Sequence, residues 1–359
     1  MIRIIVSNTE ISQGKIGSWT QRVATFTSDF PDFFNYFFGP TLQKNPKYIY
    51  CQKRPFIPIL SRFIPLLSNP LFRSSDFITA FKKIYNPSQT IQVLVMDDII
   101  LLAGFAKLKE KGFKFQLIYS FHGHSFKTGG KWFSQVDKVL FLTTLGYLST
   151  KMEYDEFTPE VSIIGNGVDS KNYFPLSLEE KTIKRTSKGY SQDDVLITWL
   201  SNDRPKKGLS LFLKLIPRLL SKYPSLRFQI IGSDLAYSLD NKRVSFIGRL
   251  PNKELPEFLQ ISDIYCFTSL WKEGFGLSLA EAAKCGNVIV ASKNGGISEV
   301  IEGLPYALLV DLPNILESWE TQVEAAILHS KSYQPDFEKL NEFHSLEIWE
   351  NRFLKALEY

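Results

Sequence analysis

Residues 263–286 read Asp263-Ile-Tyr-Cys-Phe-Thr-Ser-Leu-Trp-Lys-Glu-Gly-Phe-Gly-Leu-Ser-Leu-Ala-Glu-Ala-Ala-Lys-Cys-Gly286 and decide the fold. The apolar run 263–268 predicts a buried strand of a parallel sheet. Apolar residues at helical spacing then predict a helix that ends at Gly286. Glycines on both sides of Phe275 let the backbone come close to a ligand at the start of this helix. The stretch therefore predicts a strand, a ligand-binding turn and a helix of an α/β protein.

Two carboxylates, Glu273 and Glu281, frame this turn. Taken singly, Glu273 is explained by the helix dipole and Glu281 by a solvated helix surface. Together, Glu-Gly-Phe-Gly-Leu-x-x-x-Glu resembles the signature of retaining, nucleotide-sugar-dependent glycosyltransferases of the GT-B fold, in glycosyltransferase family 4 (glycosyl transferases group 1). Residues 294–301, Asn-Gly-Gly-Ile-Ser-Glu-Val-Ile, resemble the next loop and helix of that family.

The resemblance implies roles for the residues of this motif. Glu273 is expected to hold the hydroxyls of the donor sugar and Glu281 those of the ribose. Backbone N–H groups of the turn would also contact the donor, and they belong to Gly274, Phe275, Gly276 and Leu277.

Length and alternation predict an α/β protein with two domains. A chain of 359 residues is long for one core, and strands alternate with helical segments throughout. We therefore expect two doubly wound parallel sheets, which the resemblance makes Rossmann-like domains facing across a cleft. The expected parts are an acceptor-side domain at 1–175, a nucleotide-sugar domain at 176–335 that begins with a polar linker at 176–193, and a C-terminal helical segment at 336–359 that crosses back to the first domain.

The composition predicts a cytoplasmic protein. A strand directly after Met1 leaves no room for a signal peptide, and no apolar run is long enough to span a membrane. Three cysteines without a close pair indicate reduced thiols. Residues 1–165 hold 19 Lys and Arg against 12 Asp and Glu, whereas the remainder holds 23 against 25. The basic first half fits an anionic acceptor or membrane surface, or ordinary surface charge; no nucleic-acid motif accompanies it.

Residues 29–85 interleave aromatic, aliphatic and basic side chains, as in the stretch Lys53–Leu67. One interpretation is a core strand followed by a helical connection bent by prolines. The other is a surface that contacts lipid head groups or a lipid-linked acceptor, at the inner face of the membrane.

The first domain offers three candidate sites. The loop with Gly14 and Gly17 follows the first strand, where α/β proteins hold phosphates or sugars. Asp97-Asp98 follows another strand and is either a helix cap, which we prefer, or a catalytic base or metal site. His122 and His124 have poor spacing for zinc. The resemblance implies that His122 faces the donor sugar and that the glycine loop abuts the donor phosphate.

The second domain offers a site for the diphosphate. Basic residues precede the helix expected to begin at Leu209, and helix N–H groups favour anions. The resemblance implies that Lys207 contacts the diphosphate. Its usual arginine partner falls where this chain has Ser201 and Asn202, so Arg204 is the candidate replacement. Three further residues are expected in the donor site: Gly232 after a strand, and Arg249 and Leu250 where the family lodges the nucleotide base.

The resemblance implies transfer of a hexose from UDP- or GDP-hexose to a hydroxyl of a glycan or lipid-linked acceptor, with retention at the anomeric carbon. No metal or other cofactor is expected, because Lys207 and N–H dipoles can stabilise the leaving diphosphate. The expected context is exopolysaccharide or envelope glycan synthesis. Alternatives are a GT-B epimerase or phosphorylase, a non-catalytic sugar-nucleotide-binding protein, and a scaffold for polysaccharide assembly.

Overall fold

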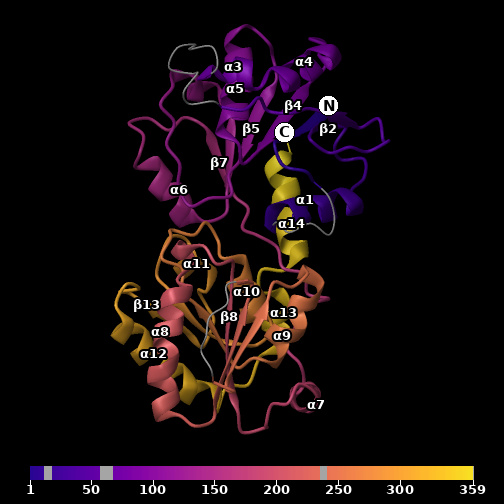
Figure 1. The fold of residues 1–359 in the computed structure, drawn as a ribbon. Helices are drawn as coiled ribbons and strands as arrows, with labels where there is room; N and C mark the ends of the chain where they lie inside the picture. The colour runs from indigo at the N-terminus through magenta and orange to yellow at the C-terminus, as the bar shows by residue number, and fades with distance from the viewer. Residues whose placement is uncertain (12–17, 57–67, 235–240, 359) are drawn as a thin grey trace. The chain divides into compact units, whose positions relative to one another are not determined.

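The computed structural model describes residues 1–11, 18–56, 68–234 and 241–358. The chain divides into two compact units (Figure 1), of which the first comprises Met1–Ile164 and Arg352–Tyr359 and the second Gly165–Asn351. The first unit thus ends before the predicted boundary at 175. The loop with Gly14 and Gly17 lies outside the described residues, as does 57–67 within the aromatic and basic stretch.

The first unit is built on a seven-stranded parallel sheet with the order β3-β2-β1-β4-β5-β6-β7. Its strands are β1 (Ile2–Ser7), β2 (Tyr36–Gly39), β3 (Tyr48–Tyr50), β4 (Ile91–Met96), β5 (Gln116–Ser120), β6 (Lys138–Phe141) and β7 (Glu160–Ile163). Its helices are α1 (Ser18–Asp29), α3 (Pro70–Arg73), α4 (Ser75–Ile84), α5 (Ile99–Glu110), α6 (Thr144–Lys151) and the end of α14 (Leu346–Leu357).

Both faces of this sheet are covered, which explains why its central strands are apolar throughout. All six residues of β4 are buried, and alternate side chains of a strand point to opposite faces. One face packs against α4 and α5 through residues such as Phe81 and Phe105. On the other side, α1 meets the end of α14, where the rings of Phe26 and Phe353 lie 5.0 Å apart (Figure 1).

The described part of 29–85 contains more regular structure than the predicted strand and bent helical connection. Two strands, β2 and β3, extend the sheet edge. The short helix α3 begins at Pro70, after Asn69 accepts a hydrogen bond from the Leu71 N–H at 2.9 Å, and α4 follows at once. Proline at the first helical position needs no backbone donor, so it starts this helix rather than breaking it.

The second unit is built on a six-stranded parallel sheet with the order β10-β9-β8-β11-β12-β13. Its strands are β8 (Val195–Leu200), β9 (Leu226–Ile231), β10 (Val244–Gly248), β11 (Ile264–Phe267), β12 (Val288–Ser292) and β13 (Ala307–Val310). Its helices are α7 (Leu178–Ser187), α8 (Leu209–Lys222), α9 (Leu255–Ile261), α10 (Leu277–Lys284), α11 (Ile297–Val300), α12 (Leu316–Ser330), α13 (Phe337–Glu342) and the start of α14.

The predicted linker at 176–193 is wrong, because most of it is the helix α7. Ser177 and Glu180 form a capping box at its start. Arg185 is buried, and its guanidinium lies 3.0 Å from the Asp263 carboxylate. The charged composition of this segment therefore reflects ion pairs that dock a helix onto the sheet, and not a solvated connection.

Two glycines at the start of the second unit, Gly165 and Gly167, have different structural roles. Gly165 has the positive φ, at 67°. Gly167 is needed for a different reason, since a β-carbon there would lie 3.0 Å from the Cα of Leu346 and 3.0 Å from the Cβ of Trp349. The chain passes directly against the start of α14 at this point.

Among the described residues, no helix combines the length and the apolar character needed to cross a membrane.

Candidate active site

The strand order of the second unit reverses direction between β8 and β11. Strands β9 and β10 follow on one side, and β12 and β13 on the other. In open parallel sheets, ligands bind at the carboxyl edge where the order reverses, because the two adjacent loops diverge there. These loops are 201–208 after β8 and 268–276 after β11, and they contain Arg204, Lys207 and residues 273–276 of the predicted donor site.

The structure brings Lys207 and Glu273 together across this point. The Lys207 ammonium lies 2.6 Å from Oε1 of Glu273, and the side chains are 20% and 14% exposed. The Ser269 hydroxyl donates to the same carboxylate oxygen at 2.5 Å. Lys207 ends the 3₁₀ turn Pro205–Lys207, so backbone geometry fixes where its side chain starts. A cation and a carboxylate are thus held side by side at the partly solvated edge of the sheet.

The glycine turn after Glu273 has the geometry that the sequence predicts. Gly276 precedes α10 and has a φ of 80°. Only glycine adopts this backbone conformation without strain. A β-carbon at this position would also lie 2.6 Å from Cδ1 of Ile297. Phe275 points into the interior and is 4% exposed. The N–H groups at the start of α10 have no earlier helical turn to bind and are suited to an anion or hydroxyl.

Glu281 is 8% exposed on α10, so it is not a solvated helix residue. Close by, the Tyr265 hydroxyl donates to the Leu200 carbonyl at 3.0 Å and lies 2.9 Å from the Ser278 hydroxyl. Burial, with a smaller contribution from Glu281, raises the pKa of Tyr265 far above its usual value, and this phenol stays protonated.

A second loop supports the Glu273 loop from the neighbouring strand. The Glu273 carbonyl accepts the Gly296 N–H at 2.8 Å, and Glu273 and Gly295 form an isolated parallel bridge. The Asn294 amide donates to the Ser269 carbonyl at 3.0 Å. Residues 294–296 therefore hold the Glu273 loop in place.

The remaining predicted donor residues are less closely gathered. Arg204 is exposed, and its place as second cation of the diphosphate site stays a prediction. The Arg249 guanidinium lies 2.7 Å from Asp234 and 3.7 Å from Asp203. Gly232 directly follows β9 with φ 93°. Leu250 follows Arg249 at the end of β10 and is half-buried.

The first unit has a candidate site of its own at the carboxyl edge of its sheet, where the order reverses between β1 and β4. The ring of His122 stacks on Trp19 with centroids 5.2 Å apart, and its Nε2 lies 3.1 Å from the Ser120 hydroxyl. Its backbone N–H donates to Asp97 at 3.0 Å. Asp97 adopts φ 48°, a left-handed conformation that is rare outside glycine.

The pKa values of these two residues are shifted in opposite directions, and both shifts favour the uncharged form. Burial, aided by nearby Arg22, lowers the pKa of His122 to about 3, so the imidazole is neutral at physiological pH. Loss of hydration of the Asp97 carboxylate raises its pKa to about 6, and the negative charge of Asp98 adds to this effect. The site thus offers a neutral imidazole and a weakly acidic carboxyl group.

The other candidates of the first unit resolve into structural roles. The Asp98 carboxylate accepts the N–H groups of Ile100 and Leu101, which confirms the helix cap, and it pairs with Lys53. His124 is buried, with its Nε2 3.1 Å from the Ser149 hydroxyl. Within the described ranges, no three His, Cys, Asp or Glu side chains group as a metal site would require.

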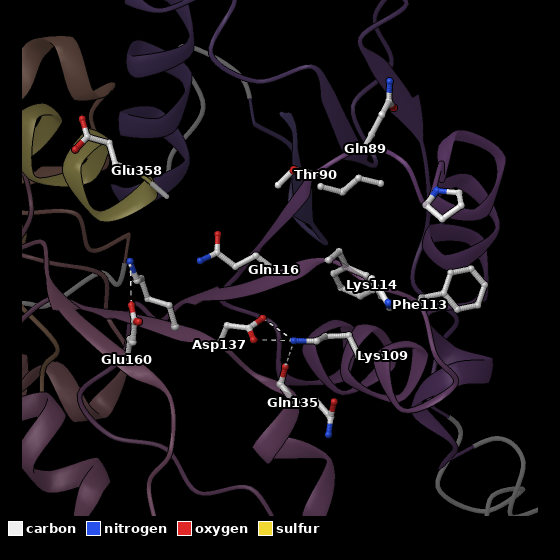
Figure 2. Close-up of a pocket in the computed structure, with 14 residues that line it drawn as sticks. Gln89, Thr90, Lys109, Phe113, Lys114, Gln116, Gln135, Asp137, Glu160 and Glu358 are labelled. Atoms are coloured by element: carbon white, nitrogen blue, oxygen red, sulfur yellow. Dashed lines mark hydrogen bonds and ion pairs between the residues drawn. The ribbon is translucent and has the colours of Figure 1, made fainter.

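A hollow of about 680 Å³ in the first unit lies at the opposite edge of the sheet. Figure 2 shows its lining, which includes residues at the starts of strands such as Gln116 and Glu160. Lys109 points to Asp137, 2.6 Å away (Figure 2), and Lys138 lies 3.3 Å from Glu160. These charges are paired with each other, and ligands of open α/β sheets bind at the other edge. We therefore do not take this hollow as the active site.

The amino-acid sequence does not predict several residues that support this site. Ser269 and Tyr265 support the site, and Lys206 places its ammonium 4.3 Å from the ring centre of Trp271. No motif marks them: Ser269 contacts Glu273 within its own loop, whereas Tyr265 and Lys206 find their partners on neighbouring elements.

Fold and site together define an α/β protein of two Rossmann-like units, each with a candidate ligand site at the carboxyl edge of a doubly wound parallel sheet. Residues 180–334 match the model of the glycosyl transferases group 1 family. The resemblance found in the sequence is thereby confirmed.

Three similar proteins illustrate the relationship. The chain is 34% identical over 146 residues to a phosphatidyl-myo-inositol mannosyltransferase of Propionibacterium freudenreichii, covering 40% of this chain and 36% of that protein. It is 29% identical over 189 residues to the GPI3 subunit of a phosphatidylinositol N-acetylglucosaminyltransferase of Saccharomyces cerevisiae, covering 49% and 40%. Sucrose-phosphate synthase of Thermosynechococcus elongatus superposes with a TM-score of 0.74 at 13% identity, covering 99% and 98%.

These comparisons differ in what they establish. The structural match extends over nearly the whole chain and confirms the GT-B fold of two parallel-sheet units. The chain spans only about 36 to 40% of the length of the two curated relatives. The activities in their names therefore belong to those proteins.

Proposed function

We propose that this chain is a retaining glycosyltransferase that moves a hexose from UDP- or GDP-hexose to a hydroxyl of a lipid-linked or glycan acceptor, without a metal ion. The observation that carries the proposal is the Lys207–Glu273 pair at the switch point of a group 1 glycosyltransferase domain. A plain nucleotide-binding unit needs no carboxylate beside its phosphate-binding lysine.

The reaction breaks the bond between the sugar and the diphosphate, so negative charge builds on the leaving group. Preorganised cations and N–H dipoles aimed at this charge supply the largest part of catalysis in such reactions. Lys207 and the turn before α10 provide both, and Glu273 would orient the hydroxyls of the sugar. Glu281, which is nearly buried, would bind the ribose hydroxyls. The acceptor hydroxyl would attack on the face that the leaving phosphate occupies, and the phosphate would take its proton.

A lipid-linked acceptor is supported by two observations. Both curated relatives are named for transfer to phosphatidylinositol, one of mannose and the other of N-acetylglucosamine, which favours the acceptor class and leaves the sugar open. In the first unit, Arg54 lies 4.7 Å from the ring centre of Phe72, and Arg73 lies 5.3 Å from that of Phe56. Arginines over aromatic rings, of which Arg54 is exposed and Arg73 half-buried, suit a contact with anionic head groups. The chain would act in envelope or exopolysaccharide synthesis as a cytoplasmic protein at the inner face of the membrane.

The test begins with a thermal-shift screen of UDP, GDP and their hexose conjugates, because a bound ligand raises the melting temperature by mass action. With the donor found, Lys207→Ala and Glu281→Ala should each lower transfer at least ~100-fold, since each removes a donor or transition-state contact. Lys214→Ala is the matched control, because Lys214 is exposed on α8.

Near-normal transfer by both variants would contradict the assignment. Release of nucleoside diphosphate without any acceptor would favour a different GT-B reaction. Sedimentation with anionic liposomes at low salt, lost at high salt, is expected for the membrane contact, and its absence would remove that part of the proposal.

A further inference from the structure

Two non-glycine residues of the described chain have positive φ, namely Asp97 at 48° and His344 at 45°. Asp97 belongs to the candidate site of the first unit. His344 lies between α13 and α14, far along the chain from every motif of the donor site. A left-handed conformation is unfavourable for a histidine, and it persists where the surrounding structure holds it in place.

The backbone around His344 is held from two sides. We call residues 340–346 the junction segment. The Val168 N–H donates to the His344 carbonyl at 2.8 Å, and the Leu346 N–H donates to the Val168 carbonyl at 3.1 Å. From the other side, the fully buried Lys284 on α10 donates to three carbonyls of the segment at 2.6 to 3.0 Å, which are those of Leu340, Asn341 and Phe343.

The side chain of His344 reaches the donor turn. Its Nε2 lies 2.8 Å from the Val300 carbonyl at the end of α11, so this nitrogen carries the proton and donates. The ring meets Phe275 edge to face, with centroids 5.0 Å apart and planes at 74°. Phe275 is buried between Gly274 and Gly276, the residues whose backbone forms the turn.

We propose that His344 is a positioning residue for the donor turn. Its ring fixes Phe275, and Phe275 sets the direction of the N–H groups at 274–277 that contact the donor. The flanking glycines allow many backbone conformations, so an outside contact is needed to select one. Hydrogen bonds to a ligand depend strongly on angle, and a displacement of about 1 Å can cost about 100-fold in rate. The inference rests on the proposed function.

The competing explanation is that His344 only packs the interior. Two variants separate the explanations. His344→Asn tolerates the left-handed backbone but has no aromatic ring to contact Phe275. His344→Phe keeps a ring against Phe275, but it strains the backbone and loses the hydrogen bond to the Val300 carbonyl. A purely structural role predicts that the more stable variant is also the better enzyme.

Positioning predicts the reverse order. His344→Asn should lower kcat/KM for the donor about tenfold or more and reduce the thermal shift by the nucleoside diphosphate, whereas His344→Phe retains more of both despite a lower melting temperature. Val323→Ala is the control, since Val323 is buried in α12, outside the junction segment; it should lower the melting temperature and leave the donor KM unchanged.

Wild-type donor parameters in His344→Asn would overturn this inference while leaving the proposed function intact, provided that Lys207→Ala is inactive. Loss of donor affinity in Val323→Ala in proportion to its stability would also overturn it. Failure of the wild-type protein to bind any nucleoside diphosphate would overturn both proposals together.

Discussion

The two units of this protein share an architecture but assemble their candidate sites differently. In the second unit, Glu273, the glycine turn and Glu281 come from one continuous stretch, and Phe275 and Glu281 are anchored in the interior. In the first unit, Trp19, Asp97 and His122 come from three separate parts of the chain, and Asp97 is exposed. The family model likewise matches 180–334, within the second unit alone.

The difference follows from what each site is proposed to bind. A nucleotide-sugar is proposed to bind in the second unit, where a compact motif with buried anchors can recognise it. The acceptor is proposed to bind in the first unit, where a site made from several loops can change one contact at a time. Both units nevertheless place their one non-glycine residue of positive φ, among the residues described, beside the proposed site.

The largest effect is expected from breaking the turn of the second unit. Gly276→Val combines a strained φ with a collision against Ile297, because the β-carbon would lie 2.6 Å from Cδ1. We expect transfer to fall at least ~100-fold, as the N–H groups are displaced. Steady-state kinetics with the identified donor measures this loss.

Gly303→Val is its matched control. Gly303 has φ 82°, but a β-carbon there meets nothing within 4 Å. If both variants lose activity equally, general destabilisation explains the result and the turn is not special.

A smaller effect is expected in the first unit. His122→Gln removes the ring that stacks on Trp19 but keeps a polar side chain near Ser120. We expect about a tenfold loss in kcat, with an unchanged thermal shift by the nucleoside diphosphate alone, which lacks the sugar that His122 would contact. A lost nucleotide shift would show that the two sites are not separable in this way.

The smallest effect concerns pH. The pKa of His122 is lowered to about 3, against about 6.5 when unfolded. The unfolded chain therefore binds more protons between these values, and the stability that the neutral imidazole contributes is full above pH 6.5 and lost as the pH falls towards 3. The pKa of Asp97 is raised to about 6, against about 3.9 when unfolded. Its contribution is full below pH 3.9 and lost as the pH rises through 6.

Denaturant unfolding between pH 4 and 7 separates these contributions. The advantage of the wild-type protein over His122→Gln should grow with rising pH, and its advantage over Asp97→Asn should shrink, because asparagine keeps the left-handed backbone but does not titrate. Parallel pH profiles for all three proteins would show that neither group is shifted in the folded state.

The amino-acid sequence by itself predicts the class of fold and the donor half of the site. Buried parallel strands are apolar runs bounded by turns, so Ile91–Met96 and Val195–Leu200 can be located from composition alone. A position that must adopt a positive φ is visible in the sequence as a glycine, as at Gly276. These signals are local because the forces behind them act within one element or one turn.

Tertiary structure decided what depends on distant partners. The segment expected to be a linker is a helix that an ion pair between Arg185 and Asp263 holds in place, and the close approach of Leu346 leaves no room for a side chain at Gly167. His344 lies near the end of the second unit in sequence but contacts Phe275, and no pattern of residue spacing connects the two. Side-chain packing between segments that are remote in sequence depends on the completed fold, which is why the motif predicts a donor chemistry and only the structure reveals what holds the motif in place.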